Sequence, residues 1–74
     1  MNEEYSKLLG KRIGALRQER NLTQEQLAAK LQVAGCDMTR SALAKIECSQ
    51  RHLYPDELKA LKTVLNVAYD ELFL

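Results

Sequence analysis

Four pairs of apolar residues, each pair five positions apart, divide most of this chain into short helices. The pairs are Leu22 with Leu27, Met38 with Leu43, Leu53 with Leu58, and Val67 with Leu72. This is the spacing of the hydrophobic staple, in which an apolar residue just before a helix packs on one inside the helix and sets the direction of the incoming chain. The pattern predicts helices that begin at Gln24, Arg40, Pro55 and Tyr69.

Residues near three of these starts favour the same boundaries. Thr23 and Gln26 have the spacing of a capping box, in which each side chain binds a free backbone N–H of the other residue. Pro55 stands at a first helical position, where its missing N–H does no harm. The acidic pairs at 56–57 and 70–71 place negative charge at the positive ends of their helices.

An earlier helix is expected over residues 5–20, with an apolar stripe at helical spacing. The stripe consists of Leu9, Ile13 and Leu16. Gly10 and Gly14 interrupt this helix, and each lowers its stability by up to about 1 kcal/mol relative to alanine. Close approach of another helix is the one explanation that the sequence offers for them. Because no segment alternates like a strand, the predicted fold is all-α with five helices.

Length and composition restrict the class of protein. The 74 residues suit one small domain, taken as residues 1–74 with its core over 7–73. No run of about 18 apolar residues occurs, so no membrane span is expected. The first residues are acidic and polar, unlike a secretory signal, and Cys36 and Cys48 are too few for a disulfide scaffold. We therefore expect a cytoplasmic protein with reduced thiols.

The small net charge of +1 hides an uneven distribution of charge. Residues 7–51 contain nine lysines and arginines against four acidic residues, whereas residues 52–74 contain two against four. A basic middle and an acidic tail are consistent with one nucleic-acid face and one partner face.

The stretch from Thr39 to Glu47 carries the strongest functional signal. Thr39 is a good helix N-cap, and Leu43 and Ile46 fall on one face of the helix that follows. The other face presents Arg40, Ser41, Ala44 and Lys45. Such a face suits the DNA major groove, where long cations reach guanine and small groups meet thymine methyls. The commoner alternative for such a stripe is a solvated basic face.

With these helices placed, the chain resembles the helix-turn-helix family of Cro and lambda-type phage repressors, also called XRE-type regulators. The matching segments are Arg12–Arg17, Leu22–Ala28, Arg40–Glu47, Leu65–Val67 and Asp70–Phe73. Together they extend over nearly the whole chain, roughly from Leu9 to Phe73. The resemblance implies a compact lambda-repressor-like domain whose second and third helices form the helix-turn-helix.

The resemblance also implies roles for individual residues. In this sequence, the family's base-contacting positions correspond to Arg40, Ser41, Ala44 and Lys45. Its phosphate-contacting positions correspond to Gln24, Thr39, Gln50 and Arg51. Its partly buried ion pair corresponds to Arg17 and Glu47. A phosphate at Gln24 agrees with the physics of a helix N-terminus, which offers free N–H groups and a positive dipole.

Two features depart from the family pattern. The connection over residues 32–38 is several residues longer than usual, which predicts a second helix about one turn longer, ending near Gly35, and a wider turn. Ala68 stands where the family often has serine, and it is a poor N-cap.

Other kinds of site have little support. Cys36, Asp37, Cys48 and His52 lack the bracketing pairs that zinc modules require, so no metal and no cofactor are expected. A cysteine nucleophile with His52 as its base lacks an orienting group and an oxyanion device, so no enzyme is expected. Tyr54 and Tyr69 are interpreted as half-buried packing at helix starts rather than base-stacking platforms.

These observations favour a sequence-specific transcriptional regulator of the repressor type that binds double-stranded DNA as a homodimer. The expected pairing surface consists of Leu53, Tyr54, Phe73 and Leu74. No membrane or small-molecule ligand is expected. The alternative is an antitoxin or protein-interaction module that keeps the fold without reading DNA.

Overall fold

The computed structural model describes residues 3–73, and all of its regular elements are helices. They are α1 (Glu3–Glu19), α2 (Gln24–Val33), α3 (Arg40–Glu47), α4 (Pro55–Leu65) and α5 (Tyr69–Leu72). The predicted starts of α2 to α5 are confirmed, and so is the five-helix all-α fold. Only the first helix differs, since α1 begins two residues before Tyr5 and ends one residue before Arg20.

Local hydrogen bonds explain where these helices begin and end. The Thr23 hydroxyl accepts from the Gln26 N–H at 3.0 Å, and Gln26 Oε1 accepts from the Thr23 N–H at 2.9 Å, which is the predicted capping box. Thr39 caps α3 by accepting from the Ala42 N–H at 3.0 Å. Gly35, with φ of 91°, takes the left-handed conformation that follows α2.

The apolar faces of all five helices meet in one core. Its largest fully buried side chains are Ile13, Leu16, Leu27, Leu31, Met38, Leu43, Leu61 and Leu65. Of the four staple pairs, those before α3 and α5 are buried at both positions, whereas Leu22 and Leu53 are partly buried. The staples therefore join the start of each helix to the common core.

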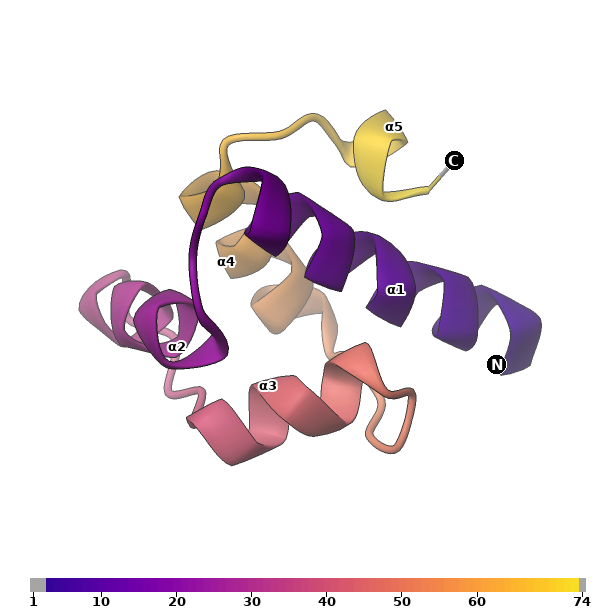
Figure 1. Ribbon diagram of the computed structural model, residues 1–74, viewed down its shortest axis with the longest axis horizontal. Coiled ribbons are helices and arrows are strands. Elements are labelled where there is room, and N and C mark those ends of the chain that lie inside the picture. Colours follow the sequence, from indigo (N-terminus) through magenta and orange to yellow (C-terminus); the bar gives the residue numbers. More distant parts are fainter. Residues whose placement is uncertain (1–2, 74) are drawn as a thin grey trace.

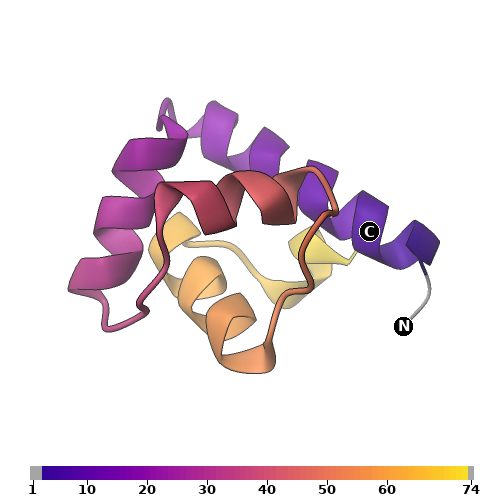
Figure 2. The ribbon, with the colours of Figure 1, turned by 90° about the horizontal axis from the view of Figure 1, so that it is seen from below.

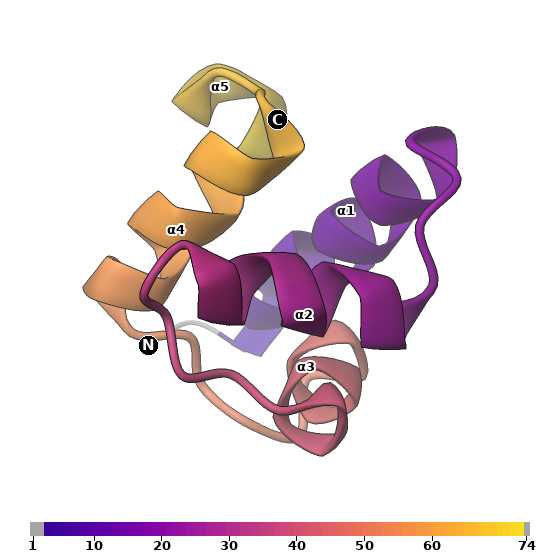
Figure 3. The same ribbon diagram turned by 90° about the vertical axis from the view of Figure 1, so that its left-hand side faces the viewer.

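The helices α1, α2 and α4 surround the buried side of α3 and leave its opposite side open (Figures 1 and 2). α3 packs against both α1 and α2, and α2 also packs on α4. Figure 3 shows α2 lying between α3 and α4. The short α5 packs on α1, at the end of the molecule remote from α3 (Figure 1). This arrangement presents α3 on one outer surface.

The two glycines of α1 lie where that helix meets the C-terminal end of α3. A Cβ on Gly10 would lie 2.5 Å from the backbone oxygen of Ile46, and a Cβ on Gly14 would lie 3.2 Å from Glu47 Oε1. Both distances are shorter than ordinary van der Waals contact. The close helix approach that the sequence left open is therefore the reason for both residues.

The tyrosines at the starts of α4 and α5 differ in how far they are buried. Tyr69 is 44% exposed and so half-buried as predicted, whereas Tyr54 is 59% exposed and is less buried than predicted. Cations cover their rings instead, with Arg51 at 5.6 Å from the Tyr54 centroid and Lys62 at 5.0 Å from the Tyr69 centroid.

Candidate nucleic-acid interface

The outward face of α3 carries the cations that the sequence placed there. Arg40, Ser41 and Lys45 are exposed, Ala44 is partly buried, and the opposite face is buried in the core. Neither Arg40 nor Lys45 forms an ion pair with any residue that the structure describes. Their charges are therefore available to an outside partner.

A hollow separates the start of α2 from the start of α3. It is lined by Arg17, Thr23, Gln24, Glu25 and Arg40. The first N–H groups of α2 lie at this hollow, and two arginines border it. A helix N-terminus beside cations is a favourable position for a phosphate.

One ion pair fixes the end of α3 to α1. Arg17 Nε lies 2.8 Å from Glu47 Oε2, and Arg17 Nη2 lies 3.0 Å from Oε1. Only 11% of the Arg17 side chain and 10% of the Glu47 side chain are exposed. The structure thus contains the ion pair that the family resemblance implied, and this pair joins the C-terminal end of α3 to α1.

Gln24 shares this ion pair. Its side-chain Nε2 donates to Glu47 Oε1 at 3.1 Å, so Glu47 links the start of α2, the end of α3 and α1. The structure therefore gives Gln24 a role in joining helices. Its predicted phosphate contact stays a prediction.

A second ion pair lies just beyond α3, and the sequence reasoning missed it. Arg51 Nη1 and Nη2 donate to the two carboxylate oxygens of Glu57, each at 2.9 Å. Glu57 Oε1 also accepts from the Tyr54 N–H at 3.0 Å. The sequence contained a signal for the latter bond, because Glu57 is the third residue of α4, where a glutamate commonly reaches back to the N-cap.

Arg51 and Glu57 each shift the pKa of the other. The hydrogen bonds from Arg51 lower the pKa of Glu57 below its ordinary value of 4.5, although burial opposes this shift. The same bonds raise the pKa of Arg51. Both groups are therefore charged near neutral pH, and Arg51, assigned above only to a phosphate, already has a protein partner.

The remaining predicted phosphate residues lie at the two ends of α3. The Thr39 hydroxyl is the N-cap acceptor and retains its own O–H as a donor. Gln50 is exposed, and its backbone N–H donates to the Lys45 oxygen at 2.7 Å. Ser49, with φ of 62°, turns the chain between α3 and Gln50. Thr39 and Gln50 therefore lie on the side of the molecule that α3 occupies, and their phosphate contacts stay predictions.

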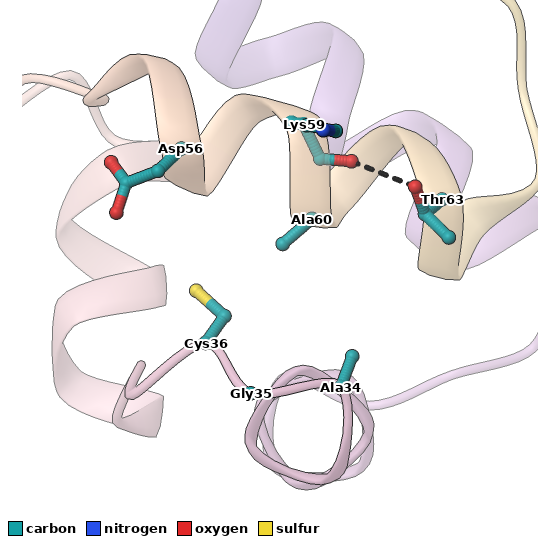
Figure 4. Close-up of a pocket in the computed structure, with 7 residues that line it drawn as sticks. All are labelled: Ala34, Gly35, Cys36, Asp56, Lys59, Ala60 and Thr63. Carbon is teal, nitrogen blue, oxygen red and sulfur yellow. Dashed lines mark hydrogen bonds between the residues drawn. The ribbon is translucent and has the colours of Figure 1, made fainter.

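Cys36 lies in a groove between the loop after α2 and α4, as Figure 4 shows. Burial is the main cause that raises the pKa of its thiol, and the carboxylates of Glu57 and Asp56 raise it further. A raised pKa disfavours the reactive thiolate. Cys48 and His52 are both exposed. Within residues 3–73, no three His, Cys, Asp or Glu side chains are grouped to hold a metal ion.

Two residues of the predicted pairing surface are exposed. Tyr54, which is 59% exposed, directly precedes α4, and Phe73, which is 52% exposed, directly follows α5. Pairing of two copies through these residues stays a prediction. Leu53 is partly buried, and Leu74 lies outside the described residues.

Comparison with protein families gives a match to the helix-turn-helix family over residues 13–72. The chain belongs to this family, in its Cro/C1-type, XRE-like branch. The helix-turn-helix consists of α2 and α3, joined by the six residues 34–39. Members of the family are DNA-binding regulators and are generally not enzymes.

Comparisons of this helix-turn-helix chain with curated proteins and with solved structures gave no match. Among the helices described, none is long and apolar enough to cross a membrane.

Proposed function

We propose that this helix-turn-helix protein is a sequence-specific transcriptional repressor that places α3 in the DNA major groove as a homodimer. The observation that carries the proposal is the exposed face of α3, with Arg40 and Lys45 free of ion pairs among the described residues. Bound to an operator, the protein would block access of the transcription machinery to the same DNA.

In the proposed docking, the exposed face of α3 contacts bases, and the starts of α2 and α3 contact phosphates. Arg40 and Lys45 reach guanine O6 and N7, while Ser41 and Ala44 allow the helix to approach the base edges closely. Thr39 and Gln24, at the starts of α3 and α2, donate to phosphates on either side of the groove. Phosphate contacts set the orientation of α3, and the base contacts set the sequence that it prefers.

Replacing Arg40 or Lys45 with alanine is expected to weaken binding to the preferred sequence by about 1–3 kcal/mol each and to relax the preference at the contacted base pairs. The preferred sequence is found first by selection from a random duplex library, and affinities are then measured on it and on a scrambled duplex. Lys59→Ala is the control, since Lys59 is an exposed cation of α4 beside the Cys36 groove.

An equal loss on all duplexes would remove Arg40 from the base-reading residues. Failure of the selection to enrich any sequence, with strongly salt-dependent binding to every duplex, would contradict the proposed function. That result would favour the alternative of an antitoxin or protein-interaction module.

For the homodimer, we propose pairing through α1 and α5. Tyr5 and Leu8 of α1 and Phe73 directly after α5 are exposed, and Leu8 and Leu72 help to line a shallow apolar groove between the two helices. The exposed side chains of Lys7 and Lys11 on α1 are basic, and those of Asp70 and Glu71 on α5 are acidic. In a two-fold contact each patch faces its counterpart on the other copy, so α1 of one copy can meet α5 of the other with opposite charge.

Phe73→Ser is expected to weaken self-association by about tenfold or more, because burial of a phenylalanine side chain contributes about 1.5–3 kcal/mol. Sedimentation over a concentration series measures the change. Val33→Ser is the matched control, since Val33 is an exposed apolar residue at the end of α2, away from α1 and α5. A wild-type protein that is monomeric both free and on its preferred DNA would contradict the pairing.

A further inference from the structure

We propose that Glu57 is a positioning residue, which holds Arg51 so that the free edge of its guanidinium receives a DNA phosphate. This inference rests on the proposed function, because it assigns a DNA contact to the segment that follows α3. The proposal predicts that Glu57 affects DNA affinity through Arg51, whereas a purely structural role for the Arg51–Glu57 pair does not.

The hydrogen bonds of Arg51 leave one edge of its guanidinium open. Nη1 and Nη2 donate end-on to Glu57, and Nη1 also approaches the His52 oxygen at 3.3 Å. The Nε–H and the second N–H of Nη2 donate to no acceptor among the described residues. These two parallel N–H groups form a fork that matches two phosphate oxygens.

The carboxylate that holds Arg51 is itself fixed. Glu57 is 8% exposed, is part of α4, and accepts a third hydrogen bond from the Tyr54 N–H. The Tyr54 ring lies against the guanidinium on another side. The Arg51 side chain remains 32% exposed despite these contacts, so the pair is ordered without being enclosed.

The position of Arg51 in the fold fits a contact to the DNA backbone. It lies four residues after the end of α3, in the loop that continues from α3 on the open side of the molecule (Figures 1 and 2). A phosphate that flanks the groove occupied by α3 would lie near this loop. An arginine that is already ordered loses little side-chain freedom when it binds that phosphate.

Loss of Glu57 has two opposite effects on DNA binding. Removing a negative charge near DNA favours binding, whereas releasing Arg51 adds the entropy of ordering a long side chain to every binding event. The carboxylate occupies the Nη1–Nη2 edge of the guanidinium, next to the open Nε–Nη2 edge, and its charge is largely neutralised by the Arg51 charge that it contacts. We therefore expect the ordering effect to be larger.

The test measures affinity of the 74-residue chain for one mixed-sequence duplex across a salt series. A phosphate contact needs no particular base sequence, so no operator has to be known. Glu57→Gln keeps the shape of the side chain and its acceptor for Tyr54, and is expected to weaken binding about two- to tenfold. Arg51→Ala is expected to weaken binding and to reduce the slope of log affinity against log salt by about 0.9.

The double variant Glu57→Gln/Arg51→Ala separates positioning from a general structural effect. If Glu57 acts through Arg51, the double variant binds no more weakly than Arg51→Ala alone. Asp56→Asn is the control, because it removes the same charge from the neighbouring exposed residue of α4 and is expected to leave binding unchanged or slightly tighter. Thermal unfolding of each variant identifies a temperature at which all variants are folded, and binding is measured at that temperature.

Tighter binding by Glu57→Gln would overturn the inference, since it would show that Glu57 neutralises Arg51. Equal losses from Glu57→Gln in the presence and absence of Arg51 would overturn it as well. Wild-type protein that binds no duplex at low salt would overturn the proposed function and this inference together. Wild-type binding with an unchanged salt slope in Arg51→Ala would overturn this inference alone.

Discussion

Replacing Gly10 with alanine is expected to lower the free energy of unfolding by about 2 kcal/mol, although alanine is the better helix former. The new Cβ would lie 2.5 Å from the Ile46 oxygen and 3.1 Å from the Glu47 oxygen. The Ile46 oxygen accepts a backbone hydrogen bond from the Ser49 N–H, so it cannot turn aside alone. Overpacking of this kind costs about 1–3 kcal/mol or more and outweighs a propensity gain of up to about 1 kcal/mol.

Chemical denaturation followed by circular dichroism measures this change. Ala15→Gly is the matched control, because Ala15 is an exposed residue of the same helix and its change reverses the propensity effect without touching α3. It is expected to lose up to about 1 kcal/mol. If Gly10→Ala instead raised stability by that amount, α1 and α3 would not approach as closely as the structure places them.

Thr23 and Gly10 illustrate which features of this fold can be predicted from the sequence and which cannot. The start of α2 was predictable because both partners of its capping box lie within four residues. The reason for Gly10 depends on Ile46, 36 positions away, and on the crossing of two helices. Local hydrogen bonds and staples therefore predicted the helices, and the contacts between helices needed the structure.

The same distinction applies to the candidate DNA interface. Helical periodicity alone predicted that Arg40 and Lys45 face outward, and both are exposed. Periodicity does not predict which carboxylate reaches an arginine in a loop, so Arg51 was assigned to phosphate without Glu57.

Replacing Glu47 with glutamine is expected to lower the free energy of unfolding by about 3 kcal/mol, near the lower limit for breaking a buried ion pair. Glu47 accepts from Arg17 Nε, Arg17 Nη2 and Gln24 Nε2. The amide cannot accept at both of its ends, so it leaves the Arg17 charge without a full partner among side chains that are about nine-tenths buried. Glu25→Gln, at an exposed glutamate without an ion pair among the described residues, should change stability by less than about 0.5 kcal/mol.

A double variant then separates the contribution of Glu47 to stability from its contribution to DNA binding. Arg17→Met with Glu47→Leu replaces the ion pair by apolar side chains, and such replacements are often neutral or stabilising. We expect stability near that of the wild type, together with weaker DNA binding, because Gln24 loses the acceptor that fixes it beside the hollow between α2 and α3. Unchanged DNA affinity in this stable variant would show that Glu47 holds the helices together without orienting Gln24. Instability as severe as that of Glu47→Gln would show that the packing around the pair depends on its charges.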